Sequence, residues 1–266
     1  MCEASQAGPA PTPRRDGPRK FLLGAIPCSS HTIAELLEEL RRLLADKSLT
    51  PRTILGVNAH IFNLACRDPQ LRRCLSAARI ITADGMSMVW AARWLGESVP
   101  ERCNLTESYH AFLADDQMPL NRAVLIGCSQ PEAEAAAAQA RRTSRHCQVV
   151  QACSGYLSDA EYEKWLAQHG DIDFIFLGMG TPRTEHVAEL AARVCPRAIV
   201  WGIGGGTVRI EAGTMSEAPR AWRRAGLQWL YRLLHNPRAL WQRYVLGNPV
   251  FLMRVVREKL KRRAGG

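Results

Sequence analysis

Four polar or glycine-rich segments each follow directly on a short run of apolar, β-branched residues. They are Asn58, residues 82–85, residues 178–182 and residues 202–206. In an open parallel sheet, ligands bind beyond the carboxyl ends of the strands. Because these ends meet along one edge of the sheet, we expect the four segments to form a single site there.

Asp84 is the first candidate for chemistry. It ends a predicted strand, and Gly85 leaves backbone room beside it. Its carboxylate could take a proton from a sugar hydroxyl during an in-line displacement. Aspartate is also among the best helix N-caps, and the spacing alone favours a cap for a helix that begins near Met86. The two roles are not exclusive, and both stay open at this point.

The two glycine runs are candidates for binding phosphate. Residues 178–182 precede a predicted helix from Arg183, and free N–H groups at the start of a helix can face an anion. Tight strand-to-helix turns would explain the glycines equally well. Neither run matches the dinucleotide-binding fingerprint, because Arg183 and Thr207 stand where its third glycine belongs. A nicotinamide-dependent oxidoreductase is therefore a poor fit.

The sequence favours neither a metal site nor a cofactor. Asp171 and Asp173 have the D-x-D spacing of metal-dependent glycosyltransferases, but they precede an apolar run and so belong to the opposite edge of the sheet. The seven histidines are scattered and lack ligand spacing. The nine cysteines contain no C-x-x-C pair, so we expect reduced thiols and no disulfide framework.

The elements that must position these residues follow from the alternation of apolar runs with helical patterns. This alternation predicts an α/β fold, a Rossmann-like parallel sheet with helices on both faces. The predicted strands are residues 21–26, 53–57, 79–81, 123–126, 148–151, 174–177 and 198–201.

The end of the chain differs in character. Residues 217–266 hold 12 Lys and Arg against two acids, which equals the net charge of +10 of the whole chain. Aromatic residues lie among the cations, a combination expected at an anionic bilayer surface. These residues are Trp222, Trp229, Tyr231, Trp241, Tyr244 and Phe251. The longest uncharged stretch there, residues 244–253, is too short to cross a bilayer, which needs roughly 20 apolar residues.

Three domains are expected from these patterns: a flexible leader (residues 1–20), an α/β core (21–213) and a basic aromatic appendage (214–266). The appendage is predicted as three short amphipathic helices, separated by Asn236-Pro237 and by residues 247–249. Because its arginines alternate with bulky apolar residues, a membrane surface is a better partner than nucleic acid.

Taken together, these segments resemble the WecG/TagA/CpsF family of bacterial glycosyltransferases (glycosyltransferase family 26) over about residues 21–257. The most specific parts are Ala83-Asp84-Gly85, the Gly-x-Gly-x-Pro-x-x-Glu loop at 178–185 and the stretch at 226–233. Asn236-Pro237-Arg238, residues 241–244 and residues 247–249 extend the match.

The resemblance implies an inverting, metal-independent transfer from a UDP-sugar to a saccharide on undecaprenyl diphosphate, at the inner face of the plasma membrane, during synthesis of a surface polysaccharide or exopolysaccharide. By motif match, Asp84 is the implied general base and Arg102 the implied substrate-contacting arginine. The implied substrate-binding residues are Asn58, Gly178, Gly180, Pro182, Thr184, Glu185, Gly204 and Gly205. Arg232, Arg238 and Arg243 match tail arginines implied to face a diphosphate.

This chain departs from the family pattern at several positions. The family commonly has Thr-Pro-Asn where Gly56-Val57-Asn58 stands, Gly-Thr within residues 104–106, and Gln at Thr184. The donor sugar therefore stays open between a hexose and an N-acetylhexosamine similar to N-acetylmannosamine. The usual Asp and Arg are exchanged at Arg209 and Glu217, and this exchange predicts that the two form an ion pair.

Two further questions stay open from the sequence. A non-catalytic module that binds a nucleotide-sugar or a lipid diphosphate would carry the same cations and glycine loops. A homo-oligomer is also compatible with the sequence.

Overall fold

The computed structural model describes residues 17–264, apart from the side chains of Arg224 and Ala239. Its centre is an eight-stranded sheet in the order β1-β2-β4-β3-β8-β7-β5-β6, in which every pairing except β1 with β2 is parallel. The strands are β1 (Lys20–Leu23), β2 (Ile26–Ser29), β3 (Thr53–Val57), β4 (Ile80–Ala83), β5 (Asn121–Gly127), β6 (Cys147–Cys153), β7 (Phe174–Gly178) and β8 (Ile199–Gly202). The predicted Rossmann-like α/β fold is confirmed.

The predicted single strand at residues 21–26 is wrong. This segment is a hairpin, in which β1 runs antiparallel to β2. Gly24 lies in the turn with φ of 58°, a left-handed conformation that glycine adopts at little steric cost. Because apolar residues lie on both sides of Gly24, the sequence pattern does not indicate this turn. The predicted leader lies almost entirely outside the described residues.

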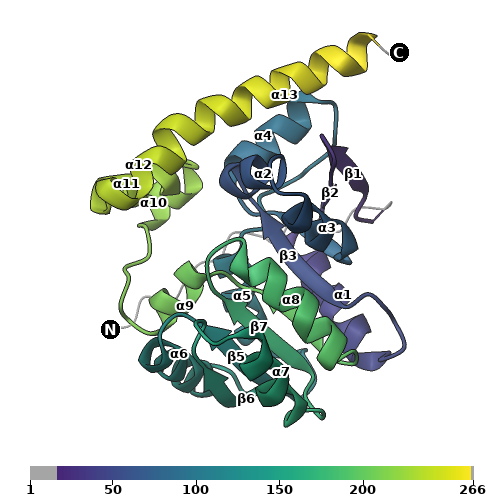
Figure 1. Cartoon of the computed structure of the whole chain (residues 1–266), viewed down its shortest axis with the longest axis vertical. Helices are drawn as coiled ribbons and strands as arrows, with labels where there is room; N and C mark the ends of the chain where they lie inside the picture. Colours follow the sequence, from purple (N-terminus) through teal and green to yellow (C-terminus); the bar gives the residue numbers. More distant parts are fainter. Residues whose placement is uncertain (1–16, 265–266) are drawn as a thin grey trace.

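Nine helices of the described chain surround the sheet (Figure 1). They are α1 (Ile33–Ala45), α2 (Ala59–Ala65), α3 (Pro69–Ala77), α4 (Met86–Trp94), α5 (Leu105–Leu113), α6 (Gln130–Thr143), α7 (Asp159–Ala167), α8 (Arg183–Val194) and α9 (Gly205–Glu211). Alternate residues of each strand point to opposite faces of a sheet, and both faces are buried here. On β7, for example, Phe174 and Phe176 join one apolar cluster, while Ile175 and Leu177 join the other.

The appendage consists of α10 (Arg220–Arg224), α11 (Gln228–His235), α12 (Pro237–Trp241), a π-helical turn η1 (Gln242–Leu246) and α13 (Gly247–Ala264). Gly226, with φ of 72°, separates α10 from α11. In Figure 1, α13 is a long helix that runs across the end of the molecule beside α2 and α4. The predicted set of three short helices is therefore wrong in its boundaries.

The expected break at residues 247–249 does not occur because a wider turn precedes it. Pro249 has no N–H to bond the carbonyl of Val245, and its ring would crowd that carbonyl in a regular α-helix. Val245 lies within η1, where the backbone follows the looser π pattern. The chain therefore passes through Pro249 without ending the helix.

The appendage packs onto the core through one face of α13. Phe251 and Val255 are 5% and 2% exposed and belong to the main apolar cluster. The ring of Phe251 meets that of Phe62 edge to face, with 5.3 Å between centroids. Arg254 donates to the backbone oxygen of Asn63 at 2.9 Å, and Lys259 donates to the backbone oxygen of Trp94 at 2.7 Å. One face of α13 is thus part of the molecule's hydrophobic core.

We predict that Phe251→Ala loosens the docked tail before it affects the sheet. Truncating a buried Phe costs about 3–5 kcal/mol, and α13 is held mainly by this face. Amide hydrogen exchange should accelerate in α13 and η1 and stay unchanged in β5. Met253→Ala, an exposed neighbour on the same helix, is the matched control. Equal exchange rates in the two variants would contradict this account.

Candidate active site

The ends of β3, β4, β7 and β8 bring the predicted site segments to one edge of the sheet. Asn58 follows β3 and Asp84 follows β4, and these strands are neighbours. The glycine runs follow β7 and β8, and β8 lies directly beside β3. The expected meeting of the four segments at the carboxyl edge is confirmed.

Asp84 is held by three hydrogen bonds from two asparagines and one backbone amide. Its Oδ1 accepts from Nδ2 of Asn104 at 3.0 Å and from the backbone N–H of Leu105 at 3.0 Å. Its Oδ2 accepts from Nδ2 of Asn58 at 3.2 Å. The expected cap role is wrong, because Gly85 is the N-cap of α4 and no side chain bonds there. The carboxylate instead faces the first turn of α5.

Helix capping fixes the direction of both asparagine amides. Oδ1 of Asn58 accepts from the first backbone N–H groups of α2, and Oδ1 of Asn104 accepts from those of α5. With each amide oxygen occupied in this way, each NH₂ group is free to point at Asp84. The helix starts therefore present two donors to a single carboxylate.

Arg102 joins the core to the appendage. Its Nη2 donates to Oε1 of Glu107 at 2.7 Å, and its Nη1 donates to Oε1 of Gln228 on α11 at 3.3 Å. Arg223 on α10 lies 3.4 Å from the same Glu107 oxygen and 2.7 Å from Glu217. The role of Gln228 could not be predicted from the sequence, because no local pattern indicates a contact with Arg102, more than a hundred positions away.

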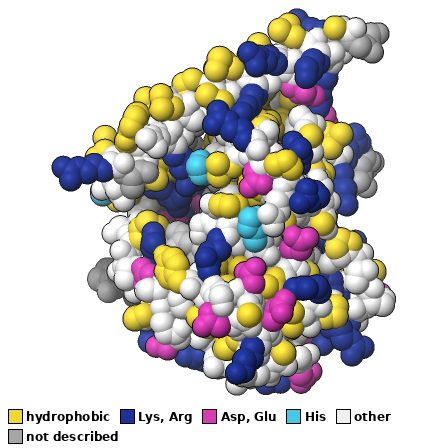
Figure 2. All heavy atoms as spheres, in the orientation of Figure 1, with side chains coloured by type: hydrophobic (Ala, Val, Ile, Leu, Met, Phe, Trp, Pro, Cys, Tyr) yellow, Lys and Arg dark blue, Asp and Glu magenta, His cyan; other side chains and the backbone are white. Residues whose placement is uncertain are grey.

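Two cavities open beside Asp84. We call the first the apolar cavity: it measures about 460 Å³ and lies between α4, α11 and α13. The second, the polar cavity, measures about 550 Å³ and lies over the ends of β3, β7 and β8. Figure 2 shows the surface hollowed between the tail and the body of the molecule, with basic side chains at the hollow. The residues common to both cavities are Asn58, His60, Asp84, Asn104, Arg232 and Arg243.

Most of the predicted loop residues line the polar cavity. Those that do are Gly180, Thr184, Glu185, Gly204 and Gly205, whereas Gly178 and Pro182 are not among its lining residues. A Cβ on Gly178 would lie 2.0 Å from Cγ2 of Val208, so this glycine allows α9 to pack against β7. Pro182 is the residue before α8. Gly178 is therefore a packing position, and the ligand contacts predicted for Gly178 and Pro182 stay predictions.

Glu185 is a buried acid in the wall of the polar cavity. It is 2% exposed, and its Oε1 accepts from Oγ1 of Thr181 at 3.0 Å. Burial raises the pKa of its carboxyl group above the ordinary value. The Glu185 carboxyl therefore keeps its proton to a higher pH than a solvent-exposed glutamic acid would.

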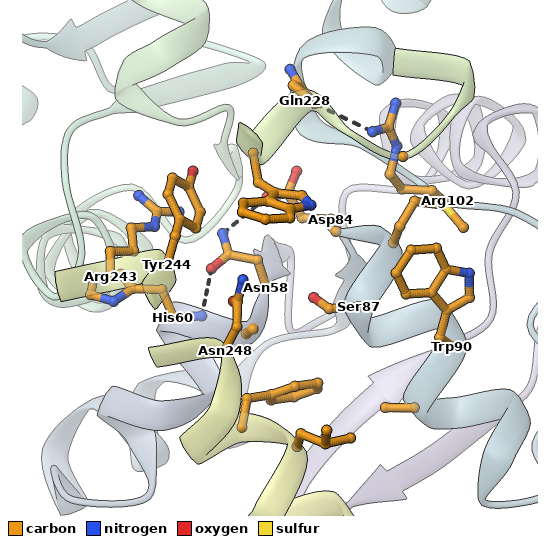
Figure 3. Close-up of a pocket in the computed structure, with 18 of the residues that line it drawn as sticks. Asn58, His60, Asp84, Ser87, Trp90, Arg102, Gln228, Arg243, Tyr244 and Asn248 are labelled. Carbon is orange, nitrogen blue, oxygen red and sulfur yellow. Dashed lines mark hydrogen bonds between the residues drawn. The ribbon is translucent and has the colours of Figure 1, made fainter. Parts of the chain in front are cut away.

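The three tail arginines do not act alike. Arg232 and Arg243 line both cavities, but Arg238 is exposed on α12 and lines neither of them. Nε of Arg243 is buried and has no hydrogen-bond partner among the described residues. In Figure 3, Arg243 lies next to Tyr244 and His60, and Asp84 lies beyond Asn58.

His60 is a site residue that sequence reasoning missed. Burial, together with the charge of Arg243, lowers the pKa of His60 to about 4. The imidazole is therefore neutral near pH 7, and it lines both cavities together with Asp84 and Arg243. Its position two residues after the strand-end asparagine was the available signal.

The predicted ion pair between Arg209 and Glu217 is not formed. Arg209 on α9 lies 3.5 Å from Glu132 on α6, and Glu217 pairs with Arg223. The chain between them turns at Gly213 and leads toward the appendage, so the two side chains face different helices. An exchange of charge signs relative to the family pattern therefore does not bring Arg209 and Glu217 into contact.

The D-x-D pair lies at the amino edge of the sheet, as expected. Asp173 pairs with Lys47 at 2.9 Å, and Asp171 pairs with Arg122 at 3.1 Å. Within residues 17–264, no three His, Cys, Asp or Glu side chains are grouped as metal ligands.

One departure from the family pattern has a steric explanation. A Cβ on Gly56 would lie 2.8 Å from Cγ and Cδ2 of Leu105. Leu105 therefore occupies the space that a side chain at position 56 would need. Leu105 also lines the polar cavity. The small residue on β3 and the large residue at the start of α5 thus form one packing unit.

The sheet and the cavities place this chain among Rossmann-like α/β proteins that bind their ligands at the carboxyl edge of the sheet. A family model for the WecG/TagA/CpsF glycosyl transferases matches residues 21–265, nearly the whole chain. The protein belongs to this family, whose members are glycosyltransferases of cell-surface polysaccharide synthesis.

We predict that positions 56 and 105 are energetically coupled. Gly56→Thr alone should destabilise the protein by about 1–3 kcal/mol, because it overpacks against Leu105. Adding Leu105→Ala should relieve that clash, so the double variant loses less stability than the sum of the single variants. Urea unfolding of all four proteins measures the coupling, expected at about 0.5–3 kcal/mol. Additive losses would contradict the steric argument.

Proposed function

We propose that this protein is an inverting glycosyltransferase that moves a hexose or an N-acetylhexosamine from a UDP-sugar to a saccharide on a polyprenyl diphosphate. Family membership supports the transferase class and its role in surface polysaccharide synthesis. The observation that carries the finer proposal is the position of Asp84, a single carboxylate where two cavities of different character meet.

The two cavities suggest separate places for donor and acceptor. The polar cavity holds the glycine loops and the start of α8, which suit a nucleotide diphosphate. The apolar cavity lies on the other side of Asp84 and is walled partly by the appendage. An inverting transfer needs the acceptor hydroxyl to attack opposite the leaving group, and two cavities meeting at a base allow that approach.

In the proposed reaction, Asp84 takes the proton of the acceptor hydroxyl as its oxygen attacks the anomeric carbon of the donor sugar. The bond from that carbon to the phosphate oxygen breaks, and UDP leaves with the electron pair. Asn58 and Asn104 hold the Asp84 carboxylate in position to accept this proton. Arg232 and Arg243 offer positive charge to the departing diphosphate.

We further propose that the appendage lies on the anionic inner face of the membrane. Apolar side chains are exposed along it, at Leu234, Trp241, Val245, Leu246, Leu252, Met253, Val256 and Leu260. Figure 2 shows apolar and basic side chains together along this edge of the molecule. Arg254 and Lys259 contact the core, whereas Arg257, Lys261 and Arg263 are exposed and free to face lipid. No described helix is long and apolar enough to cross a bilayer.

Replacing Asp84 by Asn is expected to lower sugar transfer by about 100 to 10,000-fold, because the amide cannot accept the hydroxyl proton. UDP release from a panel of UDP-sugars, with a lipid-diphosphate acceptor present, gives the rate. Affinity for UDP should stay unchanged. Asp171→Asn, at the opposite edge of the sheet, is the matched control. Full activity of the Asp84 variant would refute the role of Asp84 as general base. If the unaltered protein shows no turnover, a non-catalytic binding module is favoured.

Replacing Arg257 and Lys261 together by alanine should weaken binding of the protein to vesicles of phosphatidylglycerol and phosphatidylethanolamine. Each cation near an anionic surface contributes roughly 1 kcal/mol, so partitioning should fall about 30-fold. Flotation at low and high salt measures the effect. Replacing Arg142 and Arg145 by alanine removes the same charge from α6 and the loop after it, and should change little. Equal losses in the two double variants would contradict a membrane-facing tail.

A further inference from the structure

The exposed side of α4 is apolar, although α4 belongs to the core. Trp90 and Trp94 are 53% and 48% exposed, and their spacing of four positions places both rings on one side of the helix. α4 contains no acidic residue. Its only charged residue, Arg93, donates to the backbone oxygens of Val99 and Pro100. The two rings therefore form an apolar patch on the surface of the core, a feature that commonly marks an interaction site.

This patch continues onto the exposed side of α13. Trp90, Trp94 and Leu252 border the same apolar cavity. Nζ of Lys259 donates to the backbone oxygen of Trp94 at 2.7 Å, which joins the end of α4 to the middle of α13. Leu252, Val256 and Leu260 recur at intervals of four positions and are all exposed. We call the combined surface the shared face; it consists of Trp90, Trp94, Leu252, Val256 and Leu260.

The charge around the shared face is positive. Arg257 and Lys261 are exposed on α13. Glu258 is the only acid of α13, and it lies 3.2 Å from Arg262. Glu97, which follows α4, lies 3.0 Å from the same arginine. An anionic surface that approached these two helices would therefore meet no unpaired carboxylate on either of them.

We propose that an anionic lipid surface covers the shared face, so that α4 of the core and α13 of the appendage contact the membrane together. This inference rests on the proposed membrane association and extends it from the tail to the core. Indole rings favour the boundary between headgroups and acyl chains, where the ring is in an apolar environment and its N–H meets polar groups. A second copy of the chain would instead bring two positively charged faces together, which is unfavourable.

The shared face exists only while α13 is docked on the core. Phe251 and Val255 hold that docking, and its loss would separate Leu252 from Trp90 and Trp94. A partner that binds only one form of a protein stabilises that form. The membrane therefore holds the tail on the core and does not draw it away.

The first test is the double variant Trp90→Ala with Trp94→Ala, whose partitioning into vesicles of phosphatidylglycerol and phosphatidylethanolamine is measured by flotation. Partitioning should fall by about tenfold or more, because the two indoles no longer leave water. This loss should be equal at low and high salt, unlike the loss expected for Arg257 and Lys261. The matched control is Leu120→Ala with Val150→Ala, which are exposed apolar residues. They belong to the region of β5 and β6, at the opposite end of the molecule from α13 in Figure 1, and should have little effect.

A second test uses a conservative change that keeps an aromatic ring in place. Vesicles with brominated acyl chains quench the fluorescence of those indoles that reach the lipid. The quenched part of the emission should be smaller in Trp94→Phe than in the unaltered protein. Trp165→Phe removes an indole from α7, away from the shared face, and should leave the quenched part unchanged.

Amide hydrogen exchange tests whether the tail stays docked on the membrane. The ring of Phe62 on α2 lies against that of Phe251 on α13, so α2 would lose this cover if the tail left the core. Exchange in α2 should not accelerate when vesicles are added. Acceleration there would overturn the inference.

Three further outcomes would also overturn it. They are unchanged partitioning of the tryptophan double variant, unchanged quenching in Trp94→Phe, and sedimentation that shows a dimer which the tryptophan changes dissociate. The last outcome would assign the shared face to a second copy of the chain. UDP release from UDP-sugars is measured without vesicles, so a lack of turnover would refute the transferase proposal while leaving the shared face in place.

Discussion

The site depends on a single arrangement in which two helix caps are turned toward one carboxylate. Asn58 and Asn104 satisfy the first backbone donors of α2 and α5, and this duty leaves their NH₂ groups for Asp84. Helix capping therefore holds the side chain of Asp84, which follows β4, in place. That carboxylate lines both cavities, so under the proposed function the geometry of donor and acceptor follows from where two helices begin.

The appendage carries the net charge of the chain, but its cations serve different purposes. Arg254 and Lys259 bond to backbone oxygens of the core, and Arg223 joins the acidic pair Glu107 and Glu217. Arg232 and Arg243 turn inward to the cavities, while Arg238 faces solvent. A count of charges in the sequence therefore overstates what is available to an anionic surface. On α13, burial of one face decides which cations remain outside.

Features that depend on local chemistry could be predicted from the sequence. The strand at residues 53–57 and the position of Asp84 after a strand follow from apolar runs and the residues that end them. The hairpin at Gly24 could not be recognised, because it interrupts a continuous apolar run. The roles of Gln228 and His60 depend on contacts with Arg102 and Arg243, which are remote in sequence. The error at Arg209 and Glu217 has the same origin, since charge signs carry no information about which helix a side chain faces.

The π-helical turn η1 sets the rotational phase of α13. A π turn contains one residue more than the α-helical path, and one residue corresponds to about 100° of rotation in the helix that follows. Two apolar pairs on α13 are offset by one position: Phe251 with Val255 is buried, and Leu252 with Val256 is exposed. A helix one residue out of phase would exchange these pairs, presenting Leu252 and Val256 to Phe62 and a phenylalanine to the outside. The extra residue in η1 thus determines which apolar face belongs to the protein and which is offered to its environment.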